Sequence, residues 1–299
     1  MEFHSCLRRC RVAEASPTVA RRILAKALRE RREAARITGG KAAGHAGMHA
    51  GTLSRVESAS TRIQPGTAQL LMRFYGASDE ECEAAFQLAH LARRKGWWRS
   101  YKSVPKWFEP YLGLEADAVF LRGYQDQLLP ELFQTEEYAH LVAQASIPAL
   151  SEVEVRERVE ICLKRQERLT GLNPLRLDVV MSESALRLEV GGATTMKPQL
   201  SSLLERCDLP NVTCRIFPYS AGAFPHQSGS FTSLSFEEES QLGFSFGEVV
   251  YQGHEAGASY LEDEDTTTRF RAIFENLRDR ALSEDGSRAL IERVLTEYS

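Results

Sequence analysis

The chain has 299 residues, of which 43% are apolar and 26% charged, and its formal net charge is −4. These values are ordinary for a globular protein, and the length predicts two or three structural units rather than one. No stretch is apolar for long enough to act as a signal peptide or to span a bilayer, so we expect no membrane partner. The six cysteines contain no CxxC pair and share no metal-like spacing with the seven histidines, which predicts a reduced, cytoplasmic protein.

The charge is divided unevenly along the chain. Residues 1–110 contain 20 Lys and Arg against 10 Asp and Glu, a net charge of +10, whereas residues 111–299 contain 17 against 31, a net charge of −14. The first part therefore attracts a polyanion and the second part repels one. Taken alone, this pattern also fits a solvated basic surface.

The first part of the chain has the pattern of a small helical domain. Residues 1–16 are expected to form a disordered tail, and a basic amphipathic helix is predicted from Pro17, a residue that suits the first position of a helix. Further helices are predicted after Pro65 and after Ser78, which forms a capping box with Glu81. With two short helices between them, residues 17–95 are predicted to form an all-α domain of five helices.

The two short helices lie within residues 37–65 and have the pattern of a helix-turn-helix. Ala42 and Ala43 give the first helix a small apolar face, and Gly47 allows a positive φ in the turn. Leu53 and Val56 are expected to anchor the second helix on the core.

The outward positions of the second short helix are small, polar or cationic. A major groove can approach such a surface closely, which indicates DNA. The outward residues are His49, Gly51, Thr52, Ser54 and Arg55. Glu57 is expected to pair with an arginine of the basic helix that starts at Pro17, because DNA would repel its carboxylate.

Residues 96–112 are expected to form an aromatic hinge between the basic and acidic parts. Its aromatic residues are Trp97, Trp98, Trp107, Phe108 and Tyr111. Burial between domains is the expected role of tryptophan at a junction, and stacking on nucleic acid or lining a ligand pocket are the alternatives.

Residues 113–299 are predicted to form an α+β domain. Residues 109–145 are expected to form two helices broken around Pro130, and residues 152–169 a third. Strands are predicted at residues 175–181, 212–217, 230–236 and 248–251, and helices at residues 199–207, 266–281 and 287–297. Gly191 and Gly192 are expected to form a turn.

No catalytic constellation is found, so we expect no enzyme, no catalytic residue and no cofactor. His254 and Glu255 lack the second histidine that a zinc-protease helix needs, and the segment starting at Gln227 does not make a nucleophile elbow. A metal site formed by His226, His254 and Glu255 is an alternative, but ordinary histidines are favoured without a third convergent ligand, so no metal is expected.

From Ser16 onward, the chain resembles the lambda-repressor-like (XRE-type) helix-turn-helix regulators of bacteria, in particular those with a long C-terminal domain described as antitoxin-like. Many blocks in the same order carry the resemblance: LRERREAARITG, TLSRVES, STRIQPGTAQLLMRFYGASDEE, KGWWRSY, FEPYLGLEADA, YQDQLLPELFQTEEYA, RVEICLKRQERLTG, PNVTCRIFPYSAGAFP, GSFTSLSF and SRALIERVL. The resemblance implies a DNA-binding transcriptional regulator with a C-terminal regulatory domain. Its implied partners are operator DNA in double-stranded form, a second copy of the chain and a small companion protein.

The resemblance also implies a set of DNA contacts. The helix beginning near His49 would be the recognition helix, with the five outward residues named above facing bases or phosphates. Thr38 and Lys41 open the preceding helix and Arg62 lies in the loop after the recognition helix, where helix N-termini and cations favour phosphate.

The sequence departs from the family pattern in the same region. Gly40, Gly44, His45 and Ala46 stand where charged residues and a large apolar residue are usual, and His49 stands where Ser or Thr is usual. Each interior glycine costs a helix roughly 1 kcal/mol relative to alanine, and histidine is a poorer N-cap than serine. We therefore expect a marginally stable recognition unit that orders fully on DNA. The alternative is a protein-interaction, antitoxin-like module whose DNA-reading helix has decayed.

Overall fold

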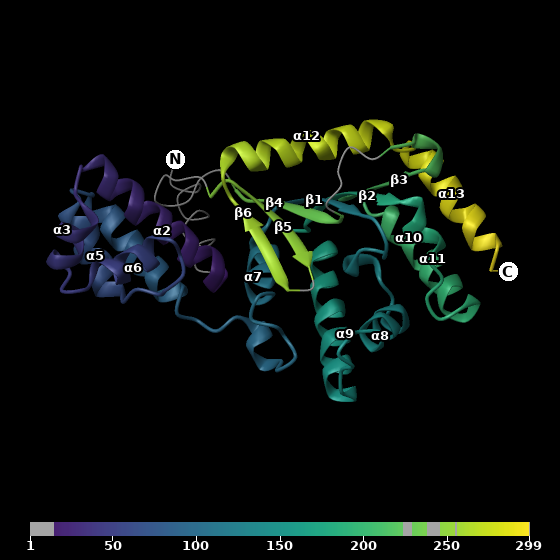
Figure 1. Cartoon of the computed structure of the whole chain (residues 1–299), viewed down its shortest axis with the longest axis horizontal. Coiled ribbons are helices and arrows are strands. Elements are labelled where there is room, and N and C mark those ends of the chain that lie inside the picture. The colour runs from purple at the N-terminus through teal and green to yellow at the C-terminus, as the bar shows by residue number, and fades with distance from the viewer. Residues whose placement is uncertain (1–14, 224–228, 238–245, 255, 299) are drawn as a thin grey trace. The chain divides into compact units, whose positions relative to one another are not determined.

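The computed structural model describes residues 15–223, 229–237, 246–254 and 256–298, and the chain forms two compact units (Figure 1). The first unit contains Met1–Arg99, Pro110–Asp117 and Phe236–Gly247, and the second contains Ser100–Glu109, Ala118–Ser235 and Glu248–Ser299. Most of the predicted tail, residues 1–14, lies outside the described residues. None of the described helices is long and apolar enough to cross a membrane.

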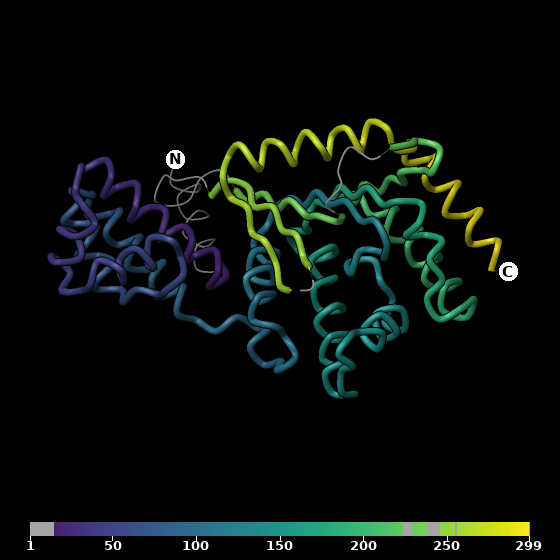
Figure 2. Tube along the Cα trace, in the orientation of Figure 1, coloured from purple at the N-terminus to yellow at the C-terminus, as the bar shows by residue number. Residues whose placement is uncertain are grey.

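Five helices form the bundle of the first unit, as the sequence predicted, and Figure 2 traces them in order along the chain. They are α2 (Pro17–Ala34), α3 (Gly39–His45), α4 (Ala50–Glu57), α5 (Pro65–Phe74) and α6 (Asp79–Leu91). The starts of α2 and α6 follow the expected local rules. Pro17 opens α2 behind the N-cap Ser16, and Ser78 and Glu81 form the predicted capping box of α6. The core of the bundle is aliphatic, and its largest fully buried side chains are Leu28, Leu53, Leu71 and Met72.

A sixth helix of this unit packs on the start of α2. After the 3-10 turn η1 (Trp97–Ser100), helix α7 (Glu109–Asp117) presents the Gly113 carbonyl to the Ser16 hydroxyl at 2.6 Å and the Asp117 carboxylate to the Ser16 amide at 2.7 Å. A Cβ on Gly113 would lie 2.2 Å from Oγ1 of Thr18. The close approach of the two helices therefore requires glycine at this position.

The second unit is built on a six-stranded mixed sheet. Its strands are β1 (Phe120–Gln125), β2 (Arg176–Ser182), β3 (Val212–Phe217), β4 (Phe231–Ser235), β5 (Glu248–His254) and β6 (Gly257–Leu261), in the order β3-β2-β1-β4-β5-β6. The three strands β1, β2 and β3 are parallel, and β4, β5 and β6 continue the sheet in antiparallel pairs. Together with the helical first unit, this arrangement confirms the predicted α+β class.

Helices cover both faces of this sheet. Figure 1 shows α12 (Glu264–Arg280) along one face and α8 (Glu136–Gln144) and α9 (Glu152–Gln166) on the other. The remaining helical segments are η2 (Glu131–Phe133), η3 (Glu167–Leu169), α10 (Glu183–Arg187), α11 (Ala193–Cys207), η4 (Tyr219–Ala221) and α13 (Glu284–Thr296). Phe270, Phe274 and Leu277 of α12 pack on an aromatic and aliphatic part of the sheet formed by Tyr124, Val180, Phe217, Phe231 and Val250.

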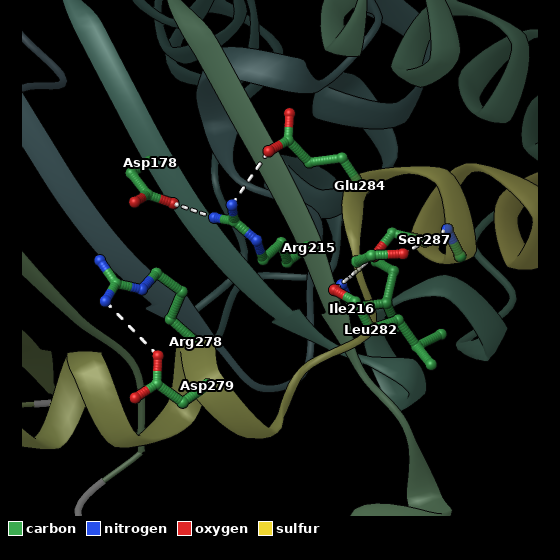
Figure 3. Close-up of polar contacts among 10 residues, drawn as sticks. Asp178, Arg215, Ile216, Arg278, Asp279, Leu282, Glu284 and Ser287 are labelled. Carbon is green, nitrogen blue, oxygen red and sulfur yellow. Dashed lines mark hydrogen bonds and ion pairs between the residues drawn. The ribbon is translucent and has the colours of Figure 1, made fainter.

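The outer edge of β3 is closed by the chain between α12 and α13. The Leu282 amide donates to the Ile216 carbonyl at 2.9 Å, and the Ile216 amide donates to the Ser287 hydroxyl at 2.9 Å (Figure 3). Side-chain and loop pairing of this kind removes a free strand edge that would otherwise recruit another strand.

Several predicted elements need correction. The two helices expected across residues 109–145 are wrong, because the central strand β1 separates α7 from α8. Helix α11 begins at Ala193, six residues before the predicted start, and β6 was not predicted. The four predicted strands are present: the strand at residues 212–217 has the predicted ends, and the other three have shifted ends. The turn at Gly191 and Gly192 is confirmed by their positive φ values of 71° and 72°.

Candidate nucleic-acid interface

Helix α4 is fixed on the bundle by two aliphatic residues. Leu53 is 1% exposed and Val56 is 3% exposed, and both belong to the core shared with α2, α3 and α5. They are three positions apart and therefore share one face of the helix. The opposite face of α4 must then point to solvent.

The turn between α3 and α4 has the conformation that the sequence predicted. Gly47 has φ of 64°, a value that residues with a Cβ rarely adopt. His45, at the end of α3, stacks on the Phe74 ring of α5 with centroids 3.9 Å apart. Sequence reasoning treated His45 only as a departure from a family pattern. Its packing role was missed because the contact joins residues 29 positions apart in the chain.

The two helices of the motif differ in their N-caps. The Thr38 side chain accepts a hydrogen bond from the Lys41 amide at 3.3 Å, so α3 has a side-chain cap. His49 is the N-cap of α4 and makes no side-chain cap hydrogen bond, as the sequence predicted for a poor capping residue. The first amides of α4 therefore keep donor capacity, and the positive end of its dipole stays uncompensated by a side chain.

A bidentate ion pair clamps the end of α4 to α2. Arg32 donates from Nε to one carboxylate oxygen of Glu57 at 2.7 Å and from a terminal nitrogen to the other at 2.9 Å, and it also donates to the Ile37 carbonyl at 3.1 Å. The hydrogen bond that Arg32 donates to Glu57 raises the pKa of Arg32 above its ordinary value. The predicted pairing of Glu57 with an arginine of the first helix is confirmed. The only carboxylate of α4 is thus neutralised by Arg32 and held away from the outward face of the helix.

Tyr75 lies near the Arg32–Glu57 pair, whose charges act on its phenol. It is buried, its hydroxyl has no hydrogen-bond partner among the described residues, and burial followed by the nearby Glu57 charge raises the pKa of its phenol to about 12. Tyr75 is therefore a neutral, structural residue at ordinary pH.

The structure places the eight predicted contact residues along one stretch of the motif. All are exposed except Thr52, which is half-buried and receives a weak hydrogen bond from Arg55 at 3.5 Å; the exposed ones are Thr38, Lys41, His49, Gly51, Ser54, Arg55 and Arg62. Within the described part of the chain, Lys41, Arg55 and Arg62 form no ion pair, so their charges are available to an external anion. Whether the eight residues touch DNA stays a prediction.

Arg36 is a further cation that the sequence analysis left out. It is exposed, has φ of 56°, and forms no ion pair among the described residues. Its position two residues before Thr38, after the last turn of α2, was the available signal. A guanidinium there adds to the positive charge at the start of α3.

The aromatic residues of the predicted hinge divide between the two units. Trp98 is buried in the first unit, where an added Cβ on Gly96 would lie 2.3 Å from its ring, and Tyr111 is buried in the same unit. Trp107 and Phe108 belong to the second unit, with ring centroids 5.7 Å apart, and Trp107 is 41% exposed.

The alternative metal site is only partly within the described residues. His254 ends β5 and is exposed, whereas His226 and Glu255 lie outside the described residues. Among the residues that the structure describes, no group of three or more His, Cys, Asp or Glu side chains is arranged to hold a metal ion.

Comparison with known families gives two matches. A family model described as a helix-turn-helix domain matches residues 23–85, which contain α3, α4 and α5. A second model, described as a domain of unknown function (DUF5753), matches residues 108–293. No curated protein and no solved structure matches the chain significantly. The first match supports a DNA-binding role for the bundle of α2 to α6.

Proposed function

Because the chain belongs to the DUF5753 family and carries a helix-turn-helix domain ahead of that region, we propose that it is a transcriptional regulator that binds double-stranded DNA through α4. The observation that supports the proposal is the division of α4 into two faces. Leu53, Val56 and the Arg32–Glu57 pair hold the inner face, while the outer face carries short and cationic side chains. A helix held in this way can enter a major groove without a conformational change in the bundle.

We assign two kinds of contact to this surface. His49, Gly51, Thr52, Ser54 and Arg55 face base edges or nearby phosphates, and Arg55 is the residue suited to a bidentate contact with guanine. Thr38, Lys41 and Arg62 contact the phosphate backbone on either side, where they set the orientation of the protein on the duplex.

The test is a mobility-shift titration of the full-length protein with its own upstream region at two salt concentrations. Affinity should fall steeply with salt, because each neutralised phosphate releases counterions. Arg55→Ala should weaken specific binding by about 1–3 kcal/mol and relax selectivity at one base pair. The matched control is Arg93→Ala, which removes an equal charge from an exposed position in the turn after α6. Equal losses in the two variants, or binding independent of salt, would reject the proposal.

The proposal extends to the family of regulator, the oligomeric state and the protein partner. We place the protein among the XRE-type, lambda-repressor-like regulators of the bacterial cytoplasm, acting as a homodimer because one short helix supplies little specificity. Its second unit is proposed to bind a small companion protein in an antitoxin-like arrangement. Co-purification of the full-length chain with the product of a neighbouring small gene tests this, and failure with soluble partners counts against it.

A second function is favoured by one observation. Helix α3 contains three glycines, Gly39, Gly40 and Gly44, and α4 has no side-chain N-cap. A motif of such low helix propensity also fits a protein-interaction module that has lost tight DNA binding. Salt-independent or absent DNA binding, with the companion protein still bound, would favour this reading over the first.

A further inference from the structure

The sheet face that carries α12 has a charged part next to its apolar part. Side chains alternate between the two faces of a strand, and Arg122, in register with Asp178 on β2 and Ser233 on β4, lies on the same face as Tyr124. Two residues along the strands, on the same face, Phe120 pairs with Arg176. The guanidinium carbons of Arg122 and Arg176 lie 4.3 and 4.8 Å from the centre of the Phe120 ring.

Two more arginines border Asp178 from other elements. Arg215 of β3 bonds Asp178 at 3.3 Å and Glu284 at 2.9 Å, and Figure 3 shows Arg278 of α12 beside them. Burial raises the pKa of Asp178, while the charges of Arg215, Arg278 and Arg122 lower it. We call Arg122, Arg176, Arg215 and Arg278 the arginine shelf.

Within the part of the chain that the structure describes, most hydrogen-bond donors of the shelf have no partner. Arg122 donates to Glu248 at 3.2 Å, and Arg271 satisfies the other oxygen of that carboxylate at 2.6 Å. Among the described residues, the Arg278 side chain pairs only with the adjacent Asp279 at 3.4 Å, and the Arg176 side chain has no ion pair or hydrogen bond. A guanidinium carries five N–H donors, so three of the four shelf arginines keep capacity for an anion.

The charge of this place differs from that of its surroundings. Four guanidiniums here, those of Arg122, Arg215, Arg271 and Arg278, are paired with the carboxylates of Asp178, Glu248, Asp279 and Glu284. Arg176 has no carboxylate partner among the described residues, although residues 111–299 have a net charge of −14. Its charge therefore favours an anion at this place in a part of the chain whose net charge repels one.

A buried hydroxyl without a hydrogen-bond partner among the described residues lies beside the arginine shelf and is a second observation. Ser233 is 2% exposed, and its Oγ has no hydrogen-bond partner among the described residues. Buried polar groups are nearly always hydrogen-bonded in folded proteins, and a functional role or a bound water or ion are among the explanations of an exception. Ser233 is the register neighbour of Arg122, the shelf residue nearest the middle of the sheet.

We propose that the arginine shelf binds the phosphoryl group of a small molecule. Arg122 and Arg176 extend from the neighbouring strands β1 and β2 over the same Phe120 ring, and Arg278 comes from α12 on the same face of the sheet, so the donors come from the sheet and from the helix that covers it. A phosphoryl group offers three terminal oxygens to such donors, whereas a carboxylate offers two. The inference is independent of DNA binding, because the shelf lies entirely within the second unit.

The experiment is isothermal titration of the full-length protein with inorganic phosphate and, separately, with phenyl phosphate, at an ionic strength held constant with sodium chloride. Saturable binding of at least one probe at one site is expected. Arg278→Gln and Arg176→Gln should each weaken it roughly tenfold or more, as expected for the loss of a charge-assisted hydrogen bond. Tighter binding of phenyl phosphate would identify an organic monoester as the ligand class, and tighter binding of inorganic phosphate the free anion.

Arg269→Gln is the matched control. Arg269 is exposed on α12 and forms no ion pair among the described residues, so this variant removes the same charge from the same helix outside the shelf. Its affinity should stay within about twofold of the parent protein, in line with the small effect of exposed charges. Absence of saturable binding of both probes, or an equal loss in Arg269→Gln and Arg278→Gln, overturns the proposal. Circular dichroism on each variant confirms that the fold is retained.

Discussion

Replacement of Gly51 by alanine should stabilise the free protein and weaken its binding to DNA. Gly51 is the second residue of α4, is exposed, and lacks a positive φ; a Cβ added there meets no atom of the protein within 4 Å. Glycine costs a helix up to about 1 kcal/mol relative to alanine, with less at the first turn. Gly51→Ala should therefore add roughly 0.5–1 kcal/mol and raise the Tm of the helical unit by roughly 2–8 °C.

Gly51→Ala should weaken the complex with DNA, although it stabilises the free protein. If α4 lies in a major groove, a methyl group at Gly51 meets DNA that approaches closely, and an inserted methyl in a packed contact costs about 1–3 kcal/mol. The expected rise in Kd is roughly 5- to 150-fold. Fluorescence anisotropy with labelled upstream duplex measures Kd, and thermal unfolding measures Tm.

Gly66 provides the matched control, because it is the second residue of α5, is exposed, and has open space around its own added Cβ. Gly66→Ala should raise Tm by a similar amount and leave Kd unchanged. A Gly51→Ala variant that gains stability and keeps the Kd of the parent protein would refute the reasoning, since nothing would then approach the start of α4.

Three further predictions concern the bundle and are read by chemical denaturation. Ala59 has φ of 56° in the turn that ends α4, so Ala59→Gly should stabilise by about 0.5–1 kcal/mol, and a loss of stability would contradict the αL assignment. Glu57→Gln should destabilise by about 2–3 kcal/mol because it breaks a largely buried bidentate pair with Arg32, whereas a change below about 0.5 kcal/mol would remove the clamp from the account. Tyr75→Phe should stabilise by about 1 kcal/mol at pH 7, because the hydroxyl is buried without a described partner. Because burial raises the pKa of Tyr75 from 10.0 to about 12, ionisation favours the unfolded chain, and the stability of the parent protein should be constant below pH 10 and fall as the pH rises toward 12. The Phe variant should lack this alkaline loss, and an equal loss in both proteins would contradict the assignment.

The helical unit was predictable because its signals are local. Pro17, the Ser78 capping box and the positive φ of Gly47 each depend on a few neighbouring residues, and the structure confirms all three. The spacing of Leu53 and Val56 fixed which face of α4 turns inward, and the charge of Glu57 predicted its ion pair.

The central strand β1 was not predictable in the same way. Phe120, Leu121 and Tyr124 are spaced so that they fit a helix as well as a strand, and the neighbouring helices favoured the helical interpretation. Pairing with β2 on one side and β4 on the other decides the matter, and both partners lie more than 50 residues away in the chain. Tertiary context of this kind overrides local propensity.

The two candidate sites also differ in how far they could be predicted from the sequence. The outward residues of α4 follow from helical periodicity, so their exposure could be predicted from the sequence. The arginine shelf joins Arg122, Arg176, Arg215 and Arg278 from four elements, and nothing in their spacing brings them together. Such a site becomes visible only when strand order and register are known.

The central claim is that the outer face of α4 contacts duplex DNA. The most direct measurement is a titration of the ¹⁵N-labelled full-length protein with its upstream duplex, followed by the amide resonances in a relaxation-optimised NMR spectrum. We expect the largest shifts at residues 38–41 and 49–55. Shifts confined to α6 or to the second unit, with the amides of α4 unchanged, would contradict it.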